Sequence, residues 1–260
     1  MGTYQEYSKV YDRSGQLAFS LKMIRYLSTL LERHPVDGRR LLELACGTGT
    51  VAAAMAAAGW KVYGIDLSAD MLFEARAKAT EAAVTVVYSQ QDMRSFVIPE
   101  RVHLVTCLYD SMNYMLTGED LLAVFRRVHA ALEPGGLFLF DMNTAYALEV
   151  LWDDEVHYSD EQDITVIFRS RYDQGHQRIT VVATVFDRQG ELYRKIQEEH
   201  IEQAYPVEQV ATLLTDVGFR AEAYYDCFSL LKAKDETFRI MWVARKGSPA
   251  GQRAHADDRT

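Results

Sequence analysis

The spacing of apolar residues along the first half of the chain alternates between two periods. A helical period of about 3.6 predicts helices at 17–33, 51–58, 69–82 and 119–132. Short apolar runs between them predict strands at 41–45, 61–66, 84–89, 102–109 and 136–142. Strands that alternate with helices are typical of a parallel sheet with right-handed crossover connections, so this half of the sequence predicts an α/β fold.

The pattern changes after residue 150. Runs with strand-like alternation fill 164–203 and are interrupted at 173–175 and 188–190 by Asp-Gln-Gly and Arg-Gln-Gly, which are hairpin signals. A helix at 207–217 and strands at 221–228 and 237–244 follow. The expected division is an N-terminal helical segment (1–35), a main domain (36–150 and 204–246), an antiparallel β insertion (151–203) and a flexible tail (247–260).

Composition narrows the classes of protein that remain. The 260 residues carry a formal net charge of −9, which argues against non-specific binding to nucleic acid because phosphates are repelled. The three cysteines are far apart and lie in apolar contexts, so they suggest neither a disulfide framework nor a metal site. The sequence has no apolar run of membrane-spanning length and no signal-peptide pattern at its start, so we expect a cytoplasmic protein without membrane contact.

A glycine-rich turn follows the first predicted strand, in the stretch LLELACGTGT. Gly47, Gly49 and Ala52 satisfy the G-x-G-x-x-G/A pattern of nucleotide-binding folds, and Asp66 ends the second strand, where it can accept ribose hydroxyls. These features suit NAD and S-adenosylmethionine equally. Glu43, four residues before Gly47, favours the second ligand, because a carboxylate repels a pyrophosphate but attracts the sulfonium and ammonium of S-adenosylmethionine.

The ends of the later strands agree with a nucleoside site. Asp92 follows the third strand, where an acid can accept a hydrogen bond from an adenine amino group, and the Met93 N–H can reach a ring nitrogen. Leu67 and Met71 are placed to enclose the ring between them. Each feature alone also fits a purely structural role, but together they occupy successive strand ends, where an open α/β sheet binds ligands.

With these segments in place, the sequence resembles the class I S-adenosylmethionine-dependent methyltransferases. The resemblance covers about residues 40–142 and is carried by ELACGTGT, GIDLSADML, QQDMRSF and LEPGG. It implies a Rossmann-like, seven-stranded, mostly parallel sheet with helices on both faces and the β insertion after strand five. It also implies S-adenosylmethionine as cofactor. The cofactor contacts we expect are Tyr11, Glu43, Ala45, Gly47, Asp66, Leu67, Met71, Asp92, Met93 and Leu108.

Three tyrosines near the N-terminus form the first candidate for the acceptor site. Segments that precede strand one commonly cover the cofactor in this family, and tyrosine rings can face a sulfonium. We predict that Tyr7 is catalytic, that Tyr4 binds the acceptor and that Tyr11 lies by the cofactor. The alternative is that Tyr7 and Tyr11, four residues apart, form the buried stripe of a first helix.

The loop after strand four, LYDSMNYM, is the second candidate because it leaves the sheet beside the methyl group. We predict that Asp110 and Tyr114 are catalytic and that Asn113 binds the acceptor. Asp141, at the end of strand five, and His200, in the insertion, are further candidates for acceptor binding. The resemblance narrows here to small-molecule N-methyltransferases, including the aminosugar N,N-dimethyltransferases, although Tyr114 stands where some of those enzymes carry a histidine.

The sequence therefore predicts an S-adenosylmethionine-dependent methyltransferase that acts on a small molecule, at nitrogen rather than oxygen. The alternatives left open are an O-methyltransferase, an RNA-modifying methyltransferase, an NAD-linked oxidoreductase and a non-catalytic cofactor-binding protein. The insertion has two interpretations. It covers the active site as a lid, or it joins two copies of the chain in a homodimer.

Overall fold

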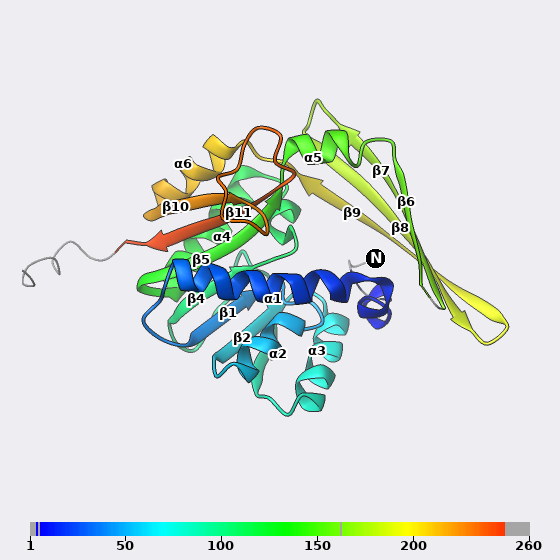
Figure 1. Ribbon diagram of the computed structural model, residues 1–260, viewed down its shortest axis with the longest axis horizontal. Coiled ribbons are helices and arrows are strands. Elements are labelled where there is room, and N and C mark those ends of the chain that lie inside the picture. Colours follow the sequence, from blue (N-terminus) through cyan, green and yellow to red (C-terminus); the bar gives the residue numbers. More distant parts are fainter. Residues whose placement is uncertain (1–3, 5, 162, 248–260) are drawn as a thin grey trace, which may run out of the picture.

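The computed structural model describes residues 4, 6–161 and 163–247, and the predicted tail at 247–260 lies almost wholly outside them. Its larger sheet has seven strands in the order β10-β11-β5-β4-β1-β2-β3 (Figure 1). These strands are β1 (Arg40–Leu44), β2 (Lys61–Asp66), β3 (Val86–Gln90), β4 (Val102–Cys107), β5 (Leu132–Asn143), β10 (Phe219–Asp226) and β11 (Arg239–Lys246). The first five are parallel, whereas β11 runs antiparallel to both of its neighbours. The predicted Rossmann-like fold class is confirmed.

Helices cover both faces of this sheet. They are α1 (Gln16–Arg33), α2 (Thr50–Ala57), α3 (Ala69–Glu81), α4 (Gly118–Ala131) and α6 (Val207–Val217). A further short helix, α5 (Ala145–Val150), packs against the insertion. One buried cluster joins the strands to α4 and α6, and a second joins them to α1 and α2. Alternate strand residues enter the two clusters, as Leu41 and Leu42 of β1 do, so the strands are buried on both faces.

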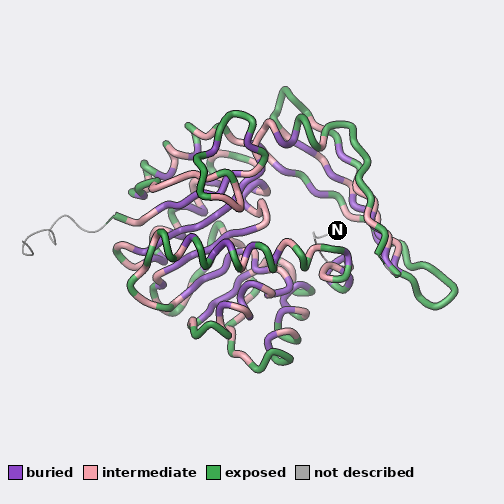
Figure 2. The backbone as a smooth tube through the Cα atoms, viewed as in Figure 1, coloured by how far each residue is buried: buried purple, intermediate pink, exposed green. Residues whose placement is uncertain are grey.

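The insertion forms a separate four-stranded antiparallel sheet in the order β6-β7-β8-β9. Its strands are β6 (Val156–Glu161), β7 (Ile164–Asp173), β8 (Arg178–Gln189) and β9 (Leu192–Gln203). The sequence pattern had not indicated β6, because its mostly exposed residues lack a clear apolar alternation. The hairpin of β8 and β9 extends beyond the rest of the molecule, and its tip is exposed (Figures 1 and 2).

The N-terminal segment lies between the insertion and the main sheet (Figure 1). It contains two short 3-10 helices, η1 (Tyr7–Lys9) and η2 (Asp12–Ser14), in place of one continuous first helix. The backbone N–H of Tyr4 donates to Glu198 of β9 at 2.7 Å, while Asp12 accepts from Thr48 beside the glycine turn at 2.8 Å. The segment is therefore bonded to both walls of the space that it crosses.

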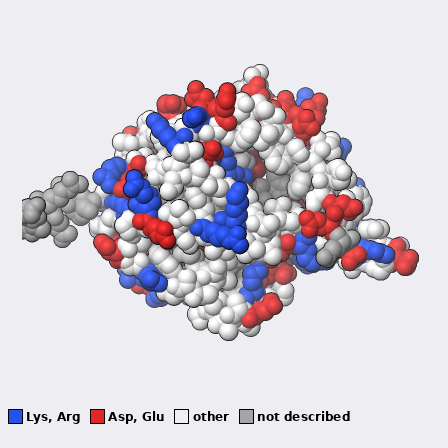
Figure 3. Space-filling view, viewed as in Figure 1, with Lys and Arg blue, Asp and Glu red and all other residues white. Residues whose placement is uncertain are grey.

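Two observations bear on the molecule's surroundings. No helix within the described residues is both long and apolar enough to cross a bilayer. Figure 3 shows basic side chains in separate groups on the face in view, interrupted by acidic and uncharged ones.

Candidate active site

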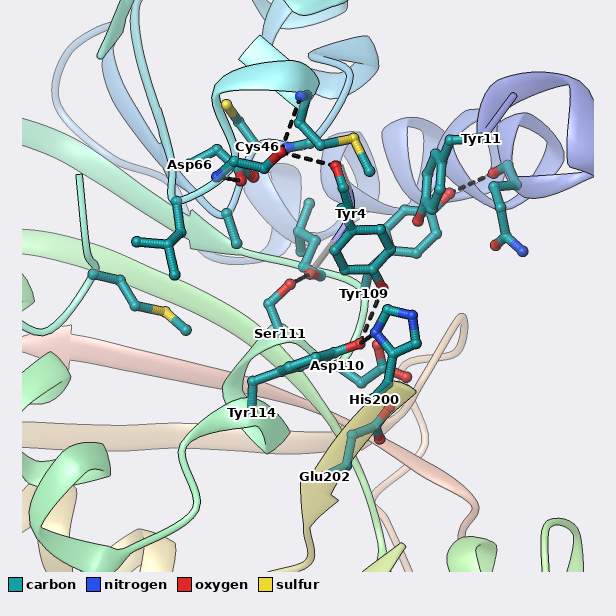
Figure 4. Close-up of a pocket in the computed structure, with 18 of the residues that line it drawn as sticks. Tyr4, Tyr11, Cys46, Asp66, Tyr109, Asp110, Ser111, Tyr114, His200 and Glu202 are labelled. Carbon is teal, nitrogen blue, oxygen red and sulfur yellow. Dashed lines mark hydrogen bonds between the residues drawn. The ribbon is translucent and has the colours of Figure 1, made fainter. Parts of the chain in front are cut away.

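A cavity of about 470 Å³ lies at the carboxyl ends of the central parallel strands. The main sheet supplies one side of its lining, and the N-terminal segment and the inner face of the insertion supply the other. Figure 4 shows the two groups of polar side chains, with Asp66 toward one end and His200 and Glu202 toward the other. The insertion is thus part of the cavity wall.

The two glycines of the turn serve different purposes. Gly47 has a φ of 53°, and a Cβ built on it would meet nothing within 4 Å, so its backbone is open to the cavity. Gly49 has a φ of 73°, and a Cβ there would collide with the hydroxyl of Tyr88 and approach Cβ of Ala75 at 2.8 Å. Gly47 therefore permits close approach by a ligand, while Gly49 permits close packing of α2.

Glu43 is buried at the cofactor end of the cavity, with 4% of its surface exposed. Burial raises the pKa of its carboxyl to about 8, and the hydrogen bond from the Ala52 backbone opposes that shift. Within the described residues its Oε2 has no hydrogen-bond partner. A buried acceptor without a partner is costly, so this oxygen fits the cationic groups of S-adenosylmethionine.

Asp66 is held by the turn that it faces. Its Oδ2 accepts the Gly47 N–H and its Oδ1 accepts the Ser68 N–H, each at 2.8 Å. A carboxylate has about four acceptor positions, so each oxygen can still accept a ribose hydroxyl. These contacts fix the carboxylate in the orientation that the predicted ribose contact requires.

Asp92 lines the cavity, but an arginine already engages it. Its carboxylate accepts from both the backbone and the side chain of Arg94, which also donates to Asp120 at 2.8 Å. The bonds to Arg94 lower the pKa of the Asp92 carboxyl despite its partial burial. The lining also includes the other predicted cofactor residues, which are Tyr11, Ala45, Leu67, Met71, Met93 and Leu108.

The opposite end of the cavity, where the sequence predicts the acceptor and which we therefore call the acceptor end, begins with a chain of three ring side chains from distant parts of the sequence. The hydroxyls of Tyr4 and Tyr114 lie 3.0 Å apart, and the Tyr114 hydroxyl lies 3.0 Å from Nδ1 of His200 (Figure 4). Burial lowers the pKa of His200 to about 4, so its imidazole is neutral at physiological pH. Burial also raises the pKa of both tyrosines, which keeps their hydroxyls protonated.

A network of charged groups continues this end of the cavity. Asp110 accepts from Asn143 Nδ2 at 2.6 Å and from Arg239 Nη2 at 2.8 Å. The same Asn143 amide donates to Glu202 Oε2 at 3.2 Å. Burial, with a further effect from the charge of Asp110, raises the pKa of Glu202 above its usual range. Arg239 also pairs with Asp141, so its single charge is shared by two acids.

Two predicted acceptor contacts lie behind the cavity wall. Asp141 is fully buried and accepts the backbone N–H groups of Tyr109 and Asp110, at 2.9 and 3.0 Å. Those two residues have the left-handed φ values of 61° and 49°, so Asp141 holds a strained loop that aims Asp110 at the cavity. Asn113 is also buried, and its amide bonds the backbone of Asn143 and Gln203. Neither side chain is in the lining, so both support the wall from behind and neither reaches the space where an acceptor would lie.

The N-terminal tyrosines all reach the cavity, in different ways. Tyr4 directs its hydroxyl to Tyr114, whereas Tyr7 is 3% exposed and bonds Ser14 Oγ at 3.0 Å. Tyr11 packs edge-on against both of the other rings. The bond to Ser14 gives Tyr7 a structural partner, so Tyr4 is the better placed of the two to contact an acceptor.

Sequence reasoning missed Glu202 and Arg239. Glu202 follows His200 by two residues on β9, so strand alternation places both side chains on the cavity face; that signal was present in the sequence. Arg239 begins β11, far along the chain from both acids that it pairs with, and no local pattern marks it.

The comparisons with known proteins agree with this geometry. A family described as a methyltransferase domain matches residues 41–136. YqeM of Bacillus subtilis (strain 168), whose name marks it as a methyltransferase candidate, is 29% identical over 94% of this chain and 97% of its own length. An S-adenosylmethionine-dependent methyltransferase from Clostridium acetobutylicum ATCC 824 is 26% identical, with a TM-score of 0.84 over 95% of this chain and 100% of that one.

One relative whose name is more specific matches only part of this chain. The dTDP-3-amino-3,6-dideoxy-alpha-D-glucopyranose N,N-dimethyltransferase of Streptomyces fradiae is 34% identical over 44% of this chain and 44% of its own length. Taken with the fold and the cofactor end of the cavity, these matches place the chain among the class I S-adenosylmethionine-dependent methyltransferases. It is an enzyme of that class, and S-adenosylmethionine is its cofactor.

Proposed function

We propose that this enzyme transfers the methyl group to an amine nitrogen of a small-molecule acceptor. The observation that carries the proposal is Glu202, a buried acid that lines the acceptor end of the cavity beside the neutral imidazole of His200. An acceptor that arrives as an ammonium ion supplies the positive charge that such an acid lacks.

The pairing of charges around Glu202 supports an amine over a hydroxyl. Arg239 forms ion pairs with Asp110 and Asp141, whereas Glu202 forms none within the described part of the chain. An alcohol brings no charge to this end of the cavity and leaves Glu202 either protonated or unpaired. An ammonium group forms a charge-assisted hydrogen bond with it and lowers its raised pKa.

An acceptor that binds as an ammonium ion must lose a proton before its nitrogen can react, and the cavity contains a group that can take this proton. S-adenosylmethionine supplies a methyl group on a sulfonium, which makes the transfer an in-line displacement. Glu202 takes a proton from the acceptor ammonium and frees the nitrogen lone pair. Tyr4 and Tyr114 hold hydroxyls near the same place, where they orient the nitrogen toward the methyl group.

The relatives that match part of the chain differ in the acceptor atom for which they are named. The Streptomyces fradiae relative is named for N,N-dimethylation and matches 44% of this chain, whereas a relative from Xanthomonas campestris pv. campestris (strain B100) that matches 48% is named a ubiquinone biosynthesis O-methyltransferase. The charges of the cavity are therefore the argument for nitrogen.

The test compares two acceptors that differ only at the reacting atom. We expect 2-phenylethylamine to be methylated with a kcat/KM at least ~10²-fold above that of 2-phenylethanol, measured as S-adenosylhomocysteine formed. Glu202→Gln should lower kcat/KM for amines by ~10²-fold and leave cofactor affinity within about a factor of three. Glu199→Gln, an exposed acid on the same strand, is the matched control. Methylation of hydroxyls in preference to amines contradicts the proposal.

A further inference from the structure

The charges and the apolar wall of the cavity together point to the chemical class of the acceptor. We infer that the acceptor is a free amine with an apolar body and without phosphate or carboxylate groups. This inference rests on the proposed function. This class excludes amines that are carried on a nucleotide.

The first argument is the balance of charge in the lining. The described lining residues include five acids and two arginines. Arg94 is paired with Asp92 and Asp120, and Arg239 is paired with Asp110 and Asp141. Each cation therefore already has two acidic partners.

A phosphate that entered this cavity would lose its hydration without gaining a free cation. It would also approach Glu202 and Asp110, two acids that offer it no positive charge. Phosphate sites usually offer arginine forks, lysines or a helix N-terminus with free N–H groups. At this end of the cavity the one described arginine of the lining, Arg239, is already paired with Asp110 and Asp141, and the other described donors are neutral hydroxyl, amide and ring N–H groups.

The second argument is the hydrocarbon wall that the insertion and α5 contribute. The side chains of this wall are Leu148 of α5, Trp152, Phe168 of β7, and Ile179 and Val181 of β8, and all five line the cavity. They belong to one apolar cluster, in which Leu148 and Ile179 are 1% exposed and Val181 is 8% exposed.

This wall requires an apolar surface on the acceptor. Water against it is displaced favourably only by hydrocarbon or an aromatic ring. The charged end at Glu202 and the apolar wall together match a molecule with an ammonium group on a hydrophobic body.

The experiment keeps the amine constant and changes the charge of the body. The acceptors are 2-phenylethylamine, phenylalanine, which adds a carboxylate, and tyramine O-phosphate, which adds a phosphate. The fourth is the dTDP-linked amino sugar for which the Streptomyces fradiae relative is named. We expect 2-phenylethylamine to exceed each anionic acceptor in kcat/KM by at least ~10²-fold.

Variants of the wall separate a contact with the acceptor from a general loss of stability. Val181→Ala should raise KM for 2-phenylethylamine by about fivefold with little change in kcat, because it removes apolar contact. Val182→Ala is the matched control, since the neighbouring side chain on β8 is outside the lining. Val181→Lys should lower kcat/KM for 2-phenylethylamine at least ~10-fold while activity on tyramine O-phosphate is kept or increased.

The outcomes distinguish this inference from the proposed function. Preference for the nucleotide-linked or phosphorylated amine overturns the inference and leaves nitrogen methylation standing. Absence of turnover with every free amine also overturns it, as does an equal effect of Val181→Ala and Val182→Ala. The proposed function fails separately, if 2-phenylethanol is methylated in preference to 2-phenylethylamine.

Discussion

Replacing Glu43 by glutamine tests whether the acid before the glycine turn is there for a cationic ligand. The substitution keeps the shape of the side chain and the hydrogen bond from Ala52, but it removes the ability to ionise. If Glu43 is present to bind a cationic ligand, then without the ligand its burial lowers the free energy of unfolding at neutral to basic pH. The glutamine variant avoids this loss, because its side chain cannot ionise.

The size of that cost follows from the pKa of the buried carboxyl. Burial raises it from 4.5 to about 8, which corresponds to at most ~5 kcal/mol. The unfolded chain releases this proton near its ordinary pKa, whereas the folded chain keeps it up to about pH 8. Between these values the folded state binds more protons, so the contribution of Glu43 lowers the free energy of unfolding as pH rises through that window.

The assay is urea unfolding of the wild type and Glu43→Gln at several pH values in that window. The two proteins should be about equally stable near pH 5, and the variant should be more stable by several kcal/mol near pH 8. Glu81→Gln, which removes an exposed acid at the end of α3, is the control and should follow the wild type. Parallel curves for the wild type and Glu43→Gln would refute the reasoning.

The same acid should couple cofactor binding to a proton. The sulfonium and ammonium of the bound cofactor lower the pKa of Glu43, so binding near pH 7 releases a proton and tightens as pH rises toward 8. Calorimetry in two buffers of different ionisation enthalpy measures that proton. In Glu43→Gln its release should disappear and the affinity should fall.

Three further predictions concern the rest of the cavity. Asp66→Ala should weaken cofactor binding by ~1–3 kcal/mol in calorimetry, because it removes charge-assisted bonds to the ribose; unchanged affinity would place the nucleoside elsewhere. Tyr114→Phe and Asp110→Asn should each lower turnover by ~10²-fold or more and keep cofactor affinity within about a factor of three. Wild-type rates in both variants would show that this loop lines the cavity without taking part in the reaction. Gly49→Ala should lower the free energy of unfolding by ~2 kcal/mol or more through its collision with Tyr88 and Ala75. Gly47→Ala should mainly weaken cofactor binding, and a larger loss of stability there than at Gly49 would show that the two glycines are assigned the wrong way round.

The cofactor end of the cavity follows from local sequence. Glu43, Gly47 and Asp66 lie at or just beyond the ends of β1 and β2, and parallel strands place such residues at one edge of the sheet. Each residue was therefore found from its distance to the end of a predicted strand. The structure adds that Arg94 engages both Asp92, two residues before it, and Asp120. Asp120 is too far along the chain for a short pattern to link it to Arg94.

The acceptor end was predicted only in part. His200 and Tyr114 were selected as separate candidates, and nothing in the sequence shows that their side chains lie 3.0 Å apart. Asp141 was selected for its place at the end of β5, yet its backbone contacts put it behind the wall. Glu202 was not selected, although its place two residues after His200 on one strand puts both side chains on the same face.

The sequence by itself determined the α/β fold, the glycine turn and the cofactor, because each depends on residue periods and on short spacings near strand ends. Only the tertiary structure decided which side chains line the end of the cavity where we propose that the acceptor binds. Those side chains come from the N-terminal segment, the loop after β4, the insertion and β11, and they extend along the chain from Tyr4 to Arg239. Their meeting depends on how the second sheet packs over the first, and that packing is spread over many weak apolar contacts that no short motif records.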